Sequence, residues 1–72
     1  MKVFSFTIRD KKDLATYIYV ISANNLKEAE KILMIYTETT SPDDKLEDFT
    51  TSLEDDNEYI TKAMLLFVYG PV

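Results

Sequence analysis

Residues 23 to 38 read ANNLKEAEKILMIYTE, and this stretch decides the fold because its apolar residues recur at helical spacing. Asn25 is suited to cap a helix. Glu28 stands three residues later, which is the spacing of a capping box with Asn in the place of Ser or Thr. The pattern predicts an amphipathic helix over about residues 26 to 37 that packs one apolar stripe on a sheet. The stripe consists of Leu26, Ala29, Ile32, Leu33 and Tyr36.

The sequence before this helix has the two-residue period of β-strands. KVFSFTIR, residues 2 to 9, alternates Phe4, Phe6 and Ile8 with polar side chains, which predicts a strand with one buried face. LATYIYVISA, residues 14 to 23, is apolar on both alternating sets and predicts a strand that is central in its sheet or covered on both faces. The two strands should pair as an antiparallel hairpin across a polar loop of about four or five residues.

The connector that follows the helix leaves two alternatives open. Ser41 and Pro42, with acids after them, fit the start of a short second helix over residues 42 to 48. Residues 49 to 53 instead fit a brief strand, with a turn at residues 55 to 57.

The last segment, EYITKAMLLFVYG at residues 58 to 70, is apolar on both alternating sets. Its Tyr, Ile, Phe and Val content favours a strand over residues 59 to 69, although residues 62 to 66 would also suit a helix. Gly70 followed by Pro71 ends it. The sequence therefore predicts a single α+β domain over residues 1 to 72. We expect a small antiparallel sheet with one helix packed on one face, in the order β-β-α-β or β-β-α-β-β.

Composition limits the chemistry and the compartment. The chain has no His and no Cys, the side chains most used for acid–base, nucleophilic and zinc chemistry. Gly70 is its one glycine, so a glycine-rich phosphate loop is excluded. We therefore expect a protein that is not an enzyme and uses no cofactor. No apolar run is long enough to span a membrane, and the N-terminal residues are too polar for a secretory signal, so we expect a soluble cytoplasmic protein.

Most of the negative charge lies in one stretch, SPDDKLEDFTTSLEDDNE at residues 41 to 58. Glu38 to Glu58 contains nine acids and one Lys, a balance of −8, and the other residues carry four acids and seven bases, a balance of +3. These acids lack the alternating spacing of an EF-hand loop, so we expect no metal site. Four bases near the first hairpin make a poor footprint for nucleic acid beside this charge, so direct nucleic-acid binding is not expected either.

Two interpretations of the acidic stretch remain. The charge can serve only to keep a small domain soluble. Alternatively, the carboxylates form a negative surface that is complementary to a cleft of a protein partner lined by Lys and Arg, with Phe49 as an apolar anchor. In this second interpretation the partner-binding residues are Asp43, Asp44, Glu47, Asp48, Phe49, Asp55, Asp56 and Glu58.

An alternative function is self-association as a structural or oligomerising domain. Tyr17 and Tyr19 lie on one face of a predicted strand and Tyr69 lies near the end of the chain. Together they would leave an aromatic patch that one helix covers only in part. Pairing two sheets in a homodimer would cover such a patch and add to a small core.

The segment YIYVISANNLKEAEKIL, residues 17 to 33, resembles the strand-into-helix part of small phage-encoded proteins that block bacterial defence systems, the anti-CRISPR proteins among them. The resemblance covers about a quarter of the chain and extends to its small size and acidic balance. It implies a protein of the host cytoplasm that binds and occludes a host nuclease or defence complex, and that has no chemistry of its own.

Overall fold

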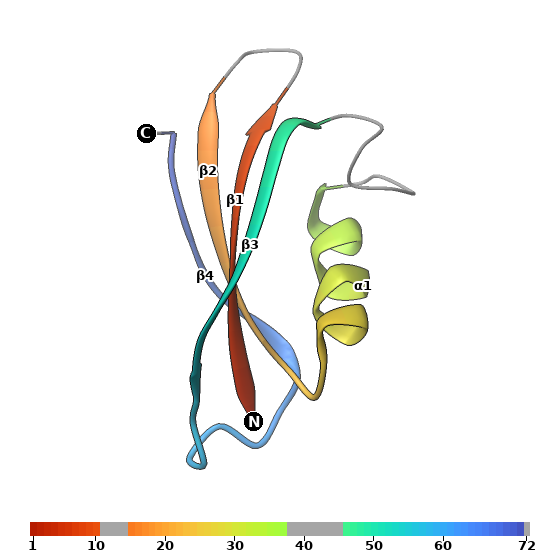
Figure 1. Ribbon diagram of the computed structural model, residues 1–72, viewed down its shortest axis with the longest axis vertical. Coiled ribbons are helices and arrows are strands. Elements are labelled where there is room, and N and C mark those ends of the chain that lie inside the picture. The colour runs from red at the N-terminus through yellow and green to blue at the C-terminus, as the bar shows by residue number, and fades with distance from the viewer. Residues whose placement is uncertain (11–14, 38–45, 72) are drawn as a thin grey trace.

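The structure, a computed structural model, describes residues 1 to 10, 15 to 37 and 46 to 71, and within them the side chains of all but residues 10 and 46 to 49. The described chain forms four strands and one helix (Figure 1). The strands make one antiparallel sheet in the order β3-β1-β2-β4. The predicted α+β fold, in the order β-β-α-β-β, is confirmed. The elements are β1 (Lys2–Asp10), β2 (Thr16–Ala23), α1 (Leu26–Thr37), β3 (Leu46–Asp56) and β4 (Met64–Tyr69).

The core lies between α1 and the face of the sheet that the helix covers. Three alternating side chains of β1 point into it, as the sequence predicted: Phe4, Phe6 and Ile8. Leu33 of α1 belongs to the same cluster and, like Phe6, has no exposed surface. β2 lies between β1 and β4, which confirms the central strand that its two apolar sets predicted.

The helix begins and ends at the predicted residues. Its cap is formed by Asn25, whose Oδ1 accepts a hydrogen bond from the backbone N–H of Glu28 at 2.9 Å. The reciprocal bond of the capping box is displaced by one residue, because Glu28 Oε1 accepts from the backbone N–H of Asn24 at 2.9 Å. The buried stripe is narrower than predicted, since Leu26 and Tyr36 at its two ends are exposed. The helix packs mainly over β2.

Asn25→Ala removes the side-chain acceptor at the start of α1. We expect the free energy of unfolding to fall by about 1 kcal/mol, the usual cost of losing such a cap. Urea denaturation followed by circular dichroism would measure it. Asn25→Ser keeps an oxygen acceptor, so its free energy of unfolding should fall much less. Equal free energies of unfolding for the two variants would contradict the role of this hydrogen bond.

The structure corrects the predicted connector. β3 takes in residues 46 to 48, so the short helix predicted over residues 42 to 48 is wrong for these three, and residues 42 to 45 lie outside the described chain. The strand predicted over residues 49 to 53 is confirmed as part of a longer one. β3 pairs with β1 from Lys2–Asp56 to Asp10–Leu46, and this long-range pairing overrides the local helix-start signal.

The strand predicted over residues 59 to 69 is confirmed only from Met64 onward. Ser22 of β2, which is fully buried, fixes this starting point. Its Oγ donates to the carbonyl of Lys62 at 2.6 Å and accepts from the N–H of Met64 at 3.1 Å. Residues 57 to 63 therefore run as a connector before β4 begins.

Candidate functional site

The structure places some of the predicted partner-binding residues and not others. Asp43 and Asp44 lie outside the described chain. Glu47, Asp48 and Phe49 lie in β3, but their side chains are outside the described part. The remaining acids are brought together and exposed at one end of the sheet: Asp55, Asp56 and Glu58.

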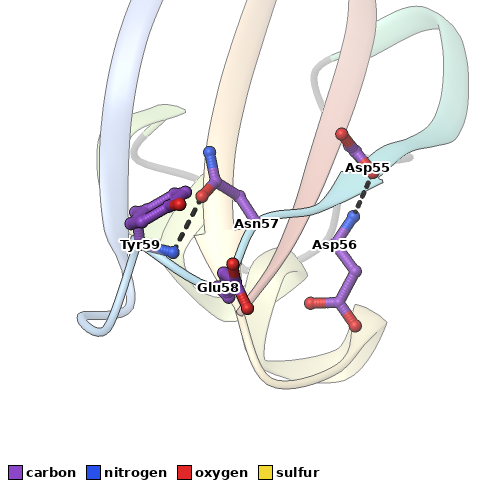
Figure 2. Close-up of a pocket in the computed structure, with 5 residues that line it drawn as sticks. All are labelled: Asp55, Asp56, Asn57, Glu58 and Tyr59. Atoms are coloured by element: carbon purple, nitrogen blue, oxygen red, sulfur yellow. Dashed lines mark hydrogen bonds between the residues drawn. The ribbon is translucent and has the colours of Figure 1, made fainter.

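We call residues 54 to 59, where β3 ends and the connector begins, the acidic tip. Its four acids are all exposed: Glu54, Asp55, Asp56 and Glu58. Residues 55 to 59 line an open depression of about 330 Å³ (Figure 2). The tip projects at the end of the sheet where the N-terminus lies (Figure 1).

Hydrogen bonds hold the backbone of the acidic tip. The N–H of Asn57 donates to the carbonyl of Met1 at 2.9 Å, and the ammonium of Met1 donates to the carbonyl of Asn57 at 2.7 Å. Asn57 Oδ1 accepts from the N–H of Tyr59 at 2.9 Å, which forms an Asx turn. Asp55 Oδ1 accepts from the N–H of Asp56 at 2.8 Å (Figure 2). The carboxylates therefore extend from a backbone that these hydrogen bonds hold in place.

The carboxylates of the tip point in several directions. Successive residues of a strand face opposite sides of the sheet, and in the register Asp55 lies opposite Val3 while Asp56 lies opposite Lys2. Figure 2 shows the Asp55 carboxylate pointing away from that of Asp56. The carboxylates of the acidic tip thus point to several sides of it and do not form a flat negative face.

Two positive groups lie next to the tip. The Met1 ammonium is 3.5 Å from Asp56 Oδ1, and Lys2 is the register partner of Asp56. Asp56 is exposed, so this ion pair contributes little to stability. Four acids against these two cations leave a local balance of −2.

Tyr59 is a candidate that the sequence interpretation missed. The sequence pattern predicts Tyr59 in a strand, but it lies in the turn after Asn57 with 87% of its surface exposed. The signal was present in the Asp-Asp-Asn-Glu turn sequence, whose Asn bonds to the N–H of Tyr59. Tyrosine is among the residue types that anchor protein interfaces, so Tyr59 is a second candidate for the anchor role predicted for Phe49.

Other site types find little support in the described chain. No group of three or more acids in the described residues is placed to hold a metal ion. The helix of the described residues, α1, is not long and apolar enough to cross a membrane. No family model matches the chain, and no curated protein or solved structure matches it either. Function is therefore inferred from the geometry of the acidic tip.

Proposed function

We propose that this protein is an acidic binding protein that inserts its acidic tip into a basic cleft of a protein partner and so occludes it. The observation that carries the proposal is the tip itself. Four exposed carboxylates extend from a hydrogen-bonded backbone beside a tyrosine that is 87% exposed. A projecting tip with charge on several sides complements a cleft with basic walls better than it complements a flat surface.

The charge distribution supports fast, oriented association. The acidic stretch has a balance of −8 and the rest of the chain a balance of +3, so a positive cleft attracts one part of the molecule and repels the other. A cleft lined by Lys and Arg for DNA or RNA would meet carboxylates where it normally meets phosphates. Tyr59 would add the desolvated aromatic contact that charge alone does not supply.

The resemblance of residues 17 to 33 to phage-encoded anti-defence proteins gives the proposal a specific form. In that form the partner is a host nuclease or defence complex, and this protein is an inhibitor of the anti-CRISPR kind. Small size, acidic balance and a sheet with one helix all support this form. The charge complementarity does not depend on it.

Capture of partners from a bacterial lysate tests the proposal. At about 0.05 M salt the immobilised protein should retain proteins with Lys- and Arg-rich clefts. At about 1 M salt it should release them, because the Debye length is then about 3 Å and charges farther apart than this hardly attract one another. Mass spectrometry would identify the retained proteins. A retained set with no excess of basic proteins, or one that high salt leaves bound, would contradict the proposal.

A further inference from the structure

The two edges of the sheet differ sharply in charge. β3 forms one edge and carries five acids among its eleven residues. β4 forms the other edge, and residues 63 to 72 contain no charged side chain. An edge strand presents backbone N–H and C=O groups that can pair with another strand, and charge is a common means of preventing such pairing. β3 has this protection and β4 lacks it.

β4 also exposes apolar side chains on both faces of the sheet. Val68 lies opposite Tyr19, on the face that α1 covers, and is 42% exposed. Phe67 and Tyr69 lie on the other face, 45% and 58% exposed, with ring centroids 5.0 Å apart. The strand therefore exposes apolar side chains above and below the sheet, and no charged side chain lies along it.

This arrangement corrects the aromatic patch expected from the sequence. Tyr17 and Tyr19 pack against the core on the helix side of the sheet. Tyr69 is the register partner of Ile18 and lies on the opposite face. The three tyrosines therefore do not form one patch, and the exposed aromatic pair is Phe67 with Tyr69.

We propose that a second copy of this chain pairs with β4, antiparallel, and joins the two four-stranded sheets into one of eight strands. Antiparallel pairing of identical strands has two-fold symmetry, so the interface closes as a dimer. A two-fold axis at Val68 sets Phe67 of each copy opposite Tyr69 of the other. Such cross-strand aromatic pairs stabilise a sheet.

Charge favours β4 over β3 as the edge at which two copies of the chain pair. Antiparallel self-pairing of β3 about its centre would bring Glu47 and Asp48 opposite Asp55 and Glu54 of the other copy, and like charges directly opposite destabilise a sheet. Each copy has a net charge of −5. Pairing through β4 places both acidic edges on the outside of the dimer, at the greatest separation that the sheet order allows.

The interface is small. β4 has six residues, and its register shifts between Val20 and Ile21 of β2, an irregularity that limits how far a flat ladder can extend. Such an edge buries less than the ~800 Å² per partner of a standard interface. The dimer is therefore reversible and depends on concentration.

Sedimentation velocity from about 1 μM to about 1 mM, the range of weak association, tests the proposal. The native chain should shift from monomer to dimer across this range. Phe67→Lys sets new positive charges close together at the interface and should remain monomeric with an unchanged circular dichroism spectrum. Thr50→Lys, an exposed change on β3, is the matched control and should still dimerise. A native chain that stays monomeric throughout would overturn the proposal.

Single-cysteine variants give a second measurement that leaves the aromatic pair intact. The chain has no Cys, so Val68→Cys and Thr50→Cys each introduce the only thiol. Residues directly opposite in an antiparallel pair have Cα atoms about 4.5 to 5.5 Å apart, within the range of a disulfide. With oxidised glutathione as oxidant, Val68→Cys should form covalent dimers several-fold faster than Thr50→Cys. Equal rates for the two would overturn the proposal.

Discussion

Leu33→Ala should lower the free energy of unfolding by about 2 to 5 kcal/mol, the range for truncating a fully buried leucine. Leu33 has no exposed surface and lies in the buried cluster that joins α1 to the sheet. A chain of 72 residues has a total stability of roughly 4 to 11 kcal/mol at typical values per residue. The substitution therefore removes a large share of the total stability of so small a chain.

Thermal and urea denaturation would measure this loss. The melting temperature should fall by about 8 to 40 °C, given about 4 to 8 °C per kcal/mol in a chain of this size. Ile35→Ala is the matched control, since Ile35 lies on the same helix and is largely exposed. Similar losses for the two variants would show that the face of α1 assigned to the core is wrong.

Ser22→Ala should lower the free energy of unfolding by about 1 to 3 kcal/mol, which is large for the loss of one oxygen atom. Ser22 is fully buried, and its Oγ serves the Lys62 carbonyl and the Met64 N–H together. Alanine leaves both backbone groups without this partner in a site that excludes water. The cost is greater than that of an ordinary surface hydrogen bond for this reason.

The effect of Ser22→Ala should concentrate at the start of β4. Hydrogen exchange should accelerate at Met64 and the residues after it, while amides in β1 keep most of their protection. Ser52→Ala is the matched control, because Ser52 lies on β3 and is exposed. Equal stability of the two variants would mean that Ser22 does not anchor β4.

Local signals were enough to predict the helix and the first hairpin. The cap at Asn25 and the apolar spacing that follows gave both ends of α1, because helical hydrogen bonds and caps connect residues only a few positions apart. The alternation of apolar and polar residues in β1 predicted its buried face, because successive side chains of a strand face opposite sides of the sheet. These parts of the fold are encoded within short windows of sequence.

Contacts between distant residues determined the parts that were predicted less well. β3 begins at Leu46 because it pairs with β1, more than thirty residues earlier, and no pattern in residues 42 to 48 records that pairing. β4 begins at Met64 because Ser22 bonds to the backbone there across a separation of 42 residues. Single-sequence periodicity does not contain such information.

The candidate site was predictable in composition but not in shape. The crowding of acids at residues 41 to 58 was visible directly, and the structure describes Asp55, Asp56 and Glu58 as exposed neighbours. The exposure of Tyr59 was not visible, since a tyrosine before an apolar run fits a strand equally well. Its position follows from the Asx turn at Asn57 and from the bonds between Asn57 and Met1.

The acidic tip extends from the end of β3, and β4 forms the other edge of the sheet, so the two proposals use different residues and are compatible. A dimer joined through β4 leaves both tips free. Two acidic tips on one dimer would raise the apparent affinity for a partner that has two basic clefts, provided that the spacing of the tips matches that of the clefts. Val68→Cys and Phe67→Lys change only β4, and substitutions of the acids at the tip leave β4 unchanged, so the two proposals can be tested separately.

A comparison of two variants with the same net charge tests the central claim most directly. One variant neutralises the tip with Asp55→Asn, Asp56→Asn and Glu58→Gln. The other adds three lysines away from it with Ile35→Lys, Tyr36→Lys and Thr50→Lys, all at exposed positions. Each changes the charge by +3, from −5 to −2.

The measurement is the affinity of each variant for the captured basic partner at one fixed salt concentration. The account predicts at least about a tenfold loss for the tip variant and a much smaller change for the variant with added lysines. Equal losses in the two would show that overall charge alone governs binding. Full binding by the tip variant would contradict the assignment of the site.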